Sequence, residues 1–392
     1  MAKTTERESR LSITLSAMLL ARIALNISYR ITYPFLPFIA RGLGVDFTSA
    51  SLLVTARAAG GLVSPIFGPL SDRYGRKRLM LAGVALLIAG AAVCAVLPRY
   101  AAFMAAFVIF GIAKAIYDPT MQAAISDRVP YEQRGRAIGI SELSWSAAWL
   151  IGVPSSGWLI ARVGWQAPFA FVAALGVAGL LLIAWVLPRD VPAVARARAS
   201  ASLQLGQVIR NHNLMAALCV TLFIILANEV TFIVYGAWME SRFGLSVVSL
   251  GVASIVIGIA EAAGEFGSTA LADRLGKRRA VLRGLVLLGI SYAVLPSLGA
   301  RLEWALGGLA LLFVAFEFTL VSSLPLVSEL APEARATAMS ANVAAITIAR
   351  IIGSAGGAAM FAHMGRLEFN ATASVIASAV AFGVLWLFVR EA

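Results

Sequence analysis

Cysteine, histidine and charged residues are all scarce in this chain of 392 residues. The two cysteines, Cys94 and Cys219, fall within long apolar stretches, so they predict no disulfide. The two histidines, His212 and His363, lie far apart without neighbouring metal ligands, and the sequence has no Walker loop and no evident nucleophile with a base partner. We therefore expect no enzyme activity, no metal and no cofactor, and any active transport must draw on an ion or substrate gradient.

Charged residues make up only 13% of the chain, whereas 60% of its residues are apolar and the mean hydropathy is +0.86. Soluble domains carry about twice that share of charge. The net charge of +12 lies in basic clusters at the ends of apolar runs, without interleaved aromatics, so we expect no nucleic-acid partner. A membrane helix needs roughly 20 apolar residues. The runs predict an all-α membrane protein whose twelve transmembrane helices cover about 12–39, 49–70, 79–97, 101–125, 137–161, 167–187, 214–238, 247–271, 281–298, 304–327, 338–361 and 369–389.

The distribution of basic residues predicts the orientation in the membrane. If the N-terminus is cytoplasmic, 20 of the 32 Lys and Arg residues lie in inside segments and only six in outside loops. This asymmetry follows the positive-inside rule. We therefore expect a multi-pass protein of a bacterial-type cytoplasmic (inner) membrane, in contact with the lipid bilayer and with both termini in the cytoplasm.

The second half of the chain repeats the first at one constant offset, about half the chain length. The stretch from Gly68 to Arg78 reads GPLSDRYGRKR, and its echo from Leu271 to Arg279 reads LADRLGKRR. A second pair of similar segments and a pair of glycines keep the same offset, which indicates a duplicated unit. We expect an N-terminal six-helix bundle over 1–187, a cytoplasmic linker over 188–211 and a C-terminal six-helix bundle over 212–392.

Ionisable residues recur inside eight of the twelve predicted helices. Each such charge costs at least about 2.5 kcal/mol at the centre of a membrane helix, and it faces the protein interior by default. The third, sixth, ninth and twelfth helices have none near their centres, so we expect these four to face lipid. The other eight are expected to enclose a polar route, basic on the wall from the first half and acidic on the other. The residues of this predicted substrate or proton pathway are Arg22, Asn26, Arg30, Tyr33, Arg57, Lys114, Asp118, Glu142, Glu229, Glu261, Glu265, Glu317 and Arg350.

Helical spacing predicts which of the acidic groups carry protons. Glu261 and Glu265 lie one turn apart, and two carboxylates this close in a low dielectric cannot both ionise cheaply, so this pair is the best candidate to hold a proton. Glu229 and Glu317 have no base in their own helix, which favours a role in transport. Asp118 is expected to pair with Lys114, which lies one helical turn earlier.

Two further choices stay open at this point. Glu142 either carries a proton or neutralises Arg350. The arginines of the first two helices either bind an anionic group of the substrate with their planar donor forks, or anchor acids of the opposite wall. These arginines are Arg22, Arg30 and Arg57.

The chain resembles the major facilitator superfamily. The motif G-x-L-x-D-R-x-G-R-R/K follows the predicted second helix in full from Gly68 to Lys77, and twelve helices in two halves with a basic central loop fit the same family. The stretch from Gly152 to Gly157 is similar to the helix-5 signature of the 12-helix drug:proton antiporters, with its proline displaced by one and Ser156 in place of a glycine. The resemblance implies a monomeric secondary transporter that works by alternating access.

The resemblance also implies a conformational latch on the cytoplasmic side. Arg73 and Arg76 are expected to pair with Asp127 at the end of the fourth helix, and Asp72 to lie at the positive N-terminal end of the eleventh. These contacts would bias the equilibrium between the two access states without touching substrate. The residues of the two predicted latches are Gly68, Asp72, Arg73, Gly75, Arg76 and Asp127 in the first half, and Asp273, Arg274, Lys277 and Glu329 in the second.

Together these observations predict a secondary active transporter for a small-molecule substrate, with protons as the coupling ion. We expect export of small amphipathic organic compounds. The alternatives are uptake of a small organic anion, proton-coupled or facilitative, and translocation of a lipid.

Overall fold

The computed structural model describes residues 2–129, 131–188, 210–331 and 335–389, and nearly all of them are helical. Within these ranges there is no β-strand. The prediction of an all-α membrane protein is therefore confirmed. Most of the predicted linker 188–211 lies outside the described residues, so the linker stays a prediction.

The chain forms two compact units, each built mainly from one half of the sequence. The first consists of Met1–Val45, Ala56–Arg196 and Val247–Val252, and the second of Asp46–Thr55, Ala197–Ser246 and Ala253–Ala392. Two short segments, at the start of the second and of the eighth predicted helix, thus group with the opposite half of the chain.

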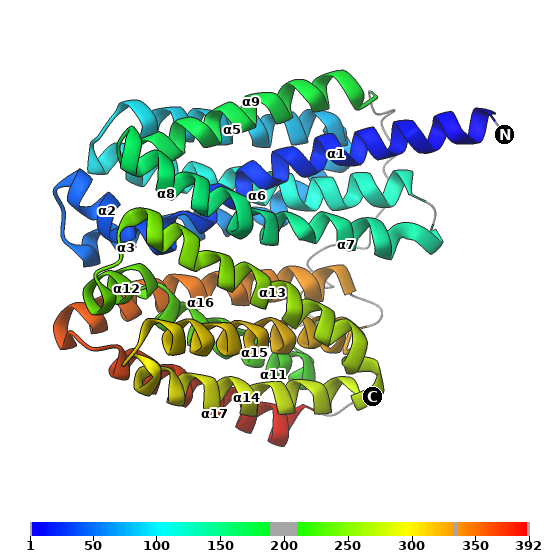
Figure 1. Ribbon diagram of the computed structural model, residues 1–392. Helices are drawn as coiled ribbons and strands as arrows, with labels where there is room; N and C mark the ends of the chain where they lie inside the picture. Colours follow the sequence, from blue (N-terminus) through cyan, green and yellow to red (C-terminus); the bar gives the residue numbers. More distant parts are fainter. Residues whose placement is uncertain (1, 130, 189–209, 332–334, 390–392) are drawn as a thin grey trace. The chain divides into compact units, whose positions relative to one another are not determined.

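The first half runs from α1 to α9 (Figure 1). Within the first unit, α5 packs against both α6 and α9, and α1 packs against α9, α7 and α6. Buried phenylalanines fill the space between α6 and α9, where the rings of Phe103 and Phe169 lie 5.3 Å apart. The elements are α1 (Ala2–Arg30), α2 (Thr32–Leu43), α3 (Phe47–Gly61), α4 (Ser64–Tyr74), α5 (Arg76–Val96), α6 (Tyr100–Arg128), α7 (Tyr131–Ala147), the π-helix η1 (Ala148–Gly152), α8 (Val153–Arg162) and α9 (Ala167–Val186).

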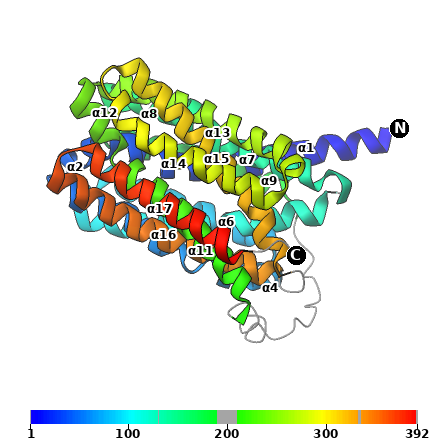
Figure 2. The same cartoon turned by 90° about the horizontal axis from the view of Figure 1, so that it is seen from below.

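The second half runs from α11 to α17, and Figure 2 shows α11 beside α16 and α17. Asn211 caps the start of α11, because its side chain accepts a hydrogen bond of 3.0 Å from the amide of Leu214. Phe232 and Phe313 join α11 to α15 with ring centroids 4.8 Å apart. The elements are α11 (His212–Phe232), α12 (Tyr235–Phe243), α13 (Val247–Leu275), α14 (Lys277–Leu298), α15 (Leu302–Glu329), α16 (Arg335–Met364) and α17 (Leu367–Phe388).

Nine helical stretches among the described residues are long and apolar enough to cross a membrane. The other three predicted helices form too, and each is interrupted: the first at Ile31, the second at Leu62 and Val63, and the fifth by η1. A proline follows each of these three interruptions within three residues, and proline removes a backbone donor that the preceding turn needs. The prolines were the sequence signal available for these breaks. The seventh, one of the nine, is interrupted between α11 and α12 without a nearby proline. The structure also extends α1 to Ala2, ahead of the predicted start at residue 12.

The outer faces of α9 and α17 are strongly apolar. On α9, Leu181 and Trp185 are 60% and 82% exposed, and Trp386 on α17 is 58% exposed. Apolar side chains this exposed suit a lipid environment. Their positions agree with the prediction that the sixth and twelfth helices face lipid.

The backbone itself carries the repeat. Among the described residues, six glycines have positive φ, and they form three pairs that match between the two halves of the chain. Gly75 and Gly276, with φ of 92° and 78°, sit in the two copies of the repeated loop. Only glycine adopts this region without strain, which explains why both copies of the motif keep it. The other pairs are Gly44 with Gly244 and Gly164 with Gly365.

Candidate functional site

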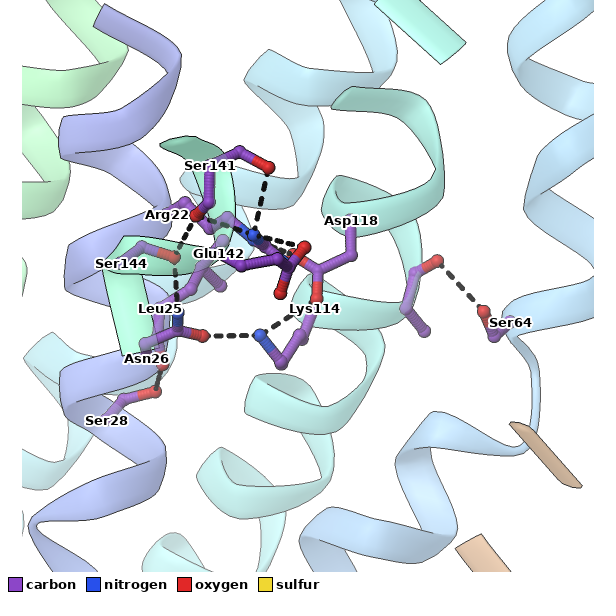
Figure 3. A network of polar contacts seen from close by, with 11 residues as sticks. Arg22, Leu25, Asn26, Ser28, Ser64, Lys114, Asp118, Ser141, Glu142 and Ser144 are labelled. Atoms are coloured by element: carbon purple, nitrogen blue, oxygen red, sulfur yellow. Dashed lines mark hydrogen bonds and ion pairs between the residues drawn. The ribbon is translucent and has the colours of Figure 1, made fainter. Parts of the chain in front are cut away.

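Five of the predicted pathway residues meet in one polar network inside the first unit (Figure 3). Arg22 and Asn26 come from α1, Lys114 and Asp118 from α6, and Glu142 from α7. These three helices pack against one another. The i, i+4 spacings of the sequence therefore turn both pairs of residues toward the same place.

Arg22 lies at the centre of this network. Its Nη1 and Nη2 atoms donate to the two carboxylate oxygens of Glu142 at 2.9 and 3.2 Å, and its Nε donates to Oδ1 of Asp118 at 3.3 Å. Nη1 also donates to the carbonyl oxygen of Ser141 at 2.7 Å. A guanidinium bound on two edges by two carboxylates is held in one orientation.

Lys114 extends the network to the other oxygen of Asp118. Its Nζ atom lies 2.9 Å from Asp118 Oδ2 and 2.5 Å from Asn26 Oδ1. The amide of Asn26 in turn donates to the hydroxyl of Ser144 at 2.8 Å, which donates to the carbonyl of Ser141 at 2.7 Å. The predicted pair of Lys114 and Asp118 is therefore present, and Asp118 is shared between two cations.

The bases of the network are buried, whereas the acids are partly exposed. The side chain of Arg22 is 3% exposed and that of Lys114 11%, whereas Asp118 is 22% and Glu142 34% exposed. With all four groups ionised, two positive and two negative charges cancel. Each proton bound at a carboxylate would change the net charge of the network by +1.

Aromatic rings border the network on one side. Nζ of Lys114 lies 4.1 Å from the ring centroid of Trp145, and Cζ of Arg30 lies 4.6 Å from the same ring and 4.9 Å from that of Trp149. The ring of Tyr29 meets Trp145 edge to face at 6.5 Å. Cations over indole faces are stabilised by the ring quadrupole.

The other two predicted pathway residues of the first unit, Tyr33 and Arg57, contact each other outside this network. Arg57 is 2% exposed, and its guanidinium reaches the α1–α2 junction, where Nη2 contacts the hydroxyl of Tyr33 at 3.5 Å. Its burial distinguishes it from Glu142 and Asp118, which are partly exposed.

In the second unit the predicted acids are placed on three helices. Glu229 on α11, Glu261 on α13 and Glu317 on α15 are at least nine-tenths buried, and Glu265 and Arg350 are half-buried. Glu317 lies against Gly264 of α13, between Glu261 and Glu265 in sequence: a Cβ added at Gly264 would fall 2.8 Å from the Cβ of Glu317. A Cβ at Gly353 of α16 would fall 2.7 Å from that of Glu229. Glycine thus lets a neighbouring helix approach two of these glutamates.

Both predicted latches contain an ion pair. Nε of Arg76 lies 3.2 Å from Oδ2 of Asp127, and Lys277 pairs with Glu329. The side chains of Asp72 and Asp273 lie outside the described part of the chain, and the surroundings of Gly68 are not described either. Arg73 and Arg274 are exposed, and Cζ of Arg73 lies 5.4 Å from the ring of Tyr74.

Two basic residues that follow the latch pairs, Lys77 and Arg278, make contacts that were not predicted from the sequence. Lys77 donates to the carbonyls of Ala184, at 2.6 Å, and Leu187 at the end of α9. Arg278, its counterpart in the second copy of the motif, donates to the carbonyl of Val389 at 2.8 Å and to that of Leu385 at the end of α17. Cations stabilise helix C-termini, so in each repeat a basic residue of the motif stabilises the C-terminal end of the last helix. The sequence signal for these contacts was the run of basic residues that both copies of the motif contain.

Comparison with known proteins agrees with this architecture. The model of the Major Facilitator Superfamily matches residues 18–354, with a second match over 217–392. The uncharacterized MFS-type transporter YceJ of Bacillus subtilis is 28% identical over 82% of each chain. The inner membrane transport protein YdhP of Escherichia coli K12 is 25% identical over 91% of this chain and 90% of that one.

Two further comparisons bear on function and fold. A homolog of the multi-drug resistance efflux pump PmrA, from Lactococcus lactis, is 26% identical over 68% of this chain and 67% of its own. The crystal structure of a D-xylose–proton symporter superimposes with a TM-score of 0.79 over 97% of both chains, at 18% identity. Since the family model covers most of the sequence and the relatives are transporters rather than enzymes, this multi-pass membrane protein is a transporter that belongs to the Major Facilitator Superfamily.

Proposed function

We propose that this transporter exports small amphipathic organic compounds in exchange for protons, by alternating access. The observation that carries the proposal is the network around Arg22, in which the two carboxylates are partly exposed while their cationic partners are buried. A proton carrier needs such acids, because they have to exchange protons with water as the route opens to each side.

The charge balance supports an exchange mechanism. When Asp118 and Glu142 are both ionised, the network is neutral and can accept the positive or polarised end of an amphipathic compound. A bound proton gives the network a net charge of +1 and opposes that end. Substrate and proton therefore weaken each other's binding, and linkage makes this effect reciprocal.

The acids of the second unit are part of the proposal. Glu261 and Glu265, one turn apart on α13, remain candidates to share a proton, and Glu229 and Glu317 remain candidates for the coupling step. Arg350 on α16 is the cation of the predicted pathway in this unit. The similarity to a multi-drug efflux pump homolog supports drug-like substrates, and the similarity to a proton symporter is one of fold alone.

Uptake of a small organic anion is the second candidate, and Arg30 is the observation that favours it. Its guanidinium lies over the faces of Trp145 and Trp149 and is half-buried, so a planar aromatic acid would meet both a cation and indole rings there. Arg22 favours it less, because both edges of its guanidinium already bind carboxylates.

Proteoliposomes that contain a trapped pH-sensitive dye test the proposal. With an imposed pH gradient, we expect compounds from a panel of lipophilic cations, beginning with ethidium, to drive protons inward as the compound moves out. Intact flux without proton movement would contradict proton coupling. Flux driven only by aromatic carboxylates would favour the second candidate, and movement of a lipid headgroup analogue that the cations do not inhibit would favour lipid translocation.

The same vesicles test which acid is involved. Glu229→Gln should abolish proton-driven flux but keep exchange of labelled for unlabelled compound. An unchanged pH dependence would remove Glu229 from the mechanism. The monomeric state and the cytoplasmic location of both termini are also proposals, which cross-linking in native membranes and protease protection of a terminal tag can check.

A further inference from the structure

Arg57 on α3 is a buried cation that the proposed exchange of protons does not use. Its Nη1 atom donates to the carbonyl oxygen of Tyr29 at 2.9 Å, to the hydroxyl of Thr32 at 3.1 Å and to the carbonyl of Ser28 at 3.5 Å. Its Nη2 donates to the hydroxyl of Tyr33 at 3.5 Å. All of these acceptors belong to the segment where α1 gives way to α2.

That segment is the interrupted part of the first transmembrane helix. α1 ends at Arg30 and α2 begins at Thr32, and Pro34 has no amide hydrogen to offer the carbonyl of Arg30. The last carbonyls of a helix carry the negative end of its dipole. The guanidinium of Arg57 therefore lies against the negative end of α1.

No carboxylate compensates this charge among the contacts of Arg57 within the described residues. Its charge is balanced instead by carbonyl dipoles and by aromatic faces. Cζ of Arg57 lies 4.0 Å from the ring centroid of Tyr29 and 5.7 Å from that of Tyr33. Carbonyl oxygens, hydroxyls and ring faces together make a site for a weakly hydrated cation.

The second half stabilises its corresponding interruption with a neutral group. The position that matches Arg57 in the second copy of the repeat is Gly258, which has no side chain. At the interruption between α11 and α12, the buried amide of Asn370 donates to the carbonyls of Val230 and Gly357, both at 2.8 Å. The cation is therefore a specific feature of the first half and not a requirement of an interrupted helix.

We propose that the end of α1 is a binding site for a guanidinium-type cation, which Arg57 occupies as a tethered ligand. Arg57 is a positioning residue: by holding the interruption, it sets the direction of α2 relative to the part of α1 that carries Arg22 and Asn26. Removal of its side chain leaves a cation site that a free guanidinium ion fills.

The experiment is chemical rescue of Arg57→Ala in the purified full-length protein. Thermal unfolding is followed with guanidinium chloride or methylguanidinium chloride at low millimolar concentration, against equal concentrations of sodium chloride. Arg57→Ala should unfold at a lower temperature than wild type, and guanidinium but not sodium should raise that temperature. At ten times its dissociation constant, the ion should lower the apparent unfolding constant about elevenfold. Arg41→Ala is the matched control. Arg41 is an exposed arginine on α2, and its Cζ lies 4.5 Å from the ring centroid of Phe38 on the same helix.

Equal effects of guanidinium and sodium on Arg57→Ala, or the same guanidinium effect on Arg41→Ala, would overturn the proposal. A second comparison applies even if the alanine variant does not fold. Arg57→Lys keeps the charge and Arg57→Gln keeps only a neutral donor, so the lysine variant should unfold at the higher temperature and keep more transport activity. If the glutamine variant equals or exceeds it, Arg57 serves packing or hydrogen bonding rather than a cation site. The thermal readouts do not depend on proton coupling, so they fail or succeed independently of the proposed function.

Discussion

Replacement of Glu142 by glutamine is expected to separate proton coupling from substrate movement. Glutamine keeps the size of the side chain and one acceptor for Arg22, but it cannot ionise. The network of Arg22, Lys114, Asp118 and residue 142 then carries a net charge of +1 as long as Asp118 is ionised. The variant is thus fixed in a state that resembles the proton-loaded form.

The size of the effect follows from the geometry. A unit charge acting over about 4 Å at an effective dielectric constant of about 20 is worth about 4 kcal/mol. Glu142 is one-third exposed, which weakens the interaction. Half of that value still exceeds the free energy of about 1.4 kcal/mol that corresponds to a tenfold change. The loss of one charged partner from the bidentate contacts at 2.9 and 3.2 Å should cost about 1–2 kcal/mol of stability, since part of the desolvation is relieved by exposure.

The assay compares two fluxes in proteoliposomes, for a compound that the wild-type protein transports. Flux driven by a pH gradient should fall at least about tenfold in Glu142→Gln, while exchange of labelled for unlabelled compound without a gradient stays within about threefold. Glu303→Gln is the matched control, because Glu303 is exposed in the first turn of α15 and should change neither flux. Gradient-driven flux that survives in Glu142→Gln would refute the role of this network, and equal loss of both fluxes would show that Glu142 only supports the fold.

Three further predictions concern other parts of the molecule. Arg76→Ala removes the ion pair with Asp127, which is worth about 0.2–1 kcal/mol at an exposed site. The variant should therefore alter transport rates while its melting temperature barely changes. A large drop in melting temperature would contradict a latch role. Gly111→Leu should prevent folding, because a Cβ there overlaps the carbonyl oxygen of Arg57. A normal yield of this variant in the membrane would contradict this, because it would show that α3 and α6 move apart to accept the side chain. Hydrogen bonds from Ser49 lower the pKa of Asp46, which caps α3. Asp46→Ala should therefore destabilise the protein above the ordinary pKa of this group, and the difference from wild type should disappear as pH falls through the lowered pKa. Thermal unfolding of both proteins across acidic pH checks this.

The sequence predicted features that depend on short spacings or on the repeat. Lys114 and Asp118 lie one turn apart on one helix, so their pairing needed no knowledge of the fold. The family motif placed Arg76 near Asp127, and the repeat extended the same kind of latch to Lys277 and Glu329. The matching glycines of the two loops follow from the same repeat.

Features that depend on how helices pack were not predictable in this way. Glu142 binds Arg22, which is distant in sequence, because α7 packs against α1. No pattern in either helix encodes that choice over other acids. The contacts of Arg57 with the end of α1 were hidden for the same reason, since its charge alone was equally compatible with a substrate site.

The central claim is that the charged side chains of the first unit line an aqueous route rather than a lipid surface. Glu142 and Leu143 on α7 test it directly, because they are adjacent and both reach the molecular surface: 34% of the Glu142 side chain and 44% of residue Leu143 are exposed. With Cys94 and Cys219 replaced, a cysteine at each position is treated in intact membranes with a membrane-impermeant maleimide. We predict that Glu142→Cys reacts and that Leu143→Cys does not, because water reaches only the first. Equal reactivity, or reaction at position 143 alone, would contradict the account.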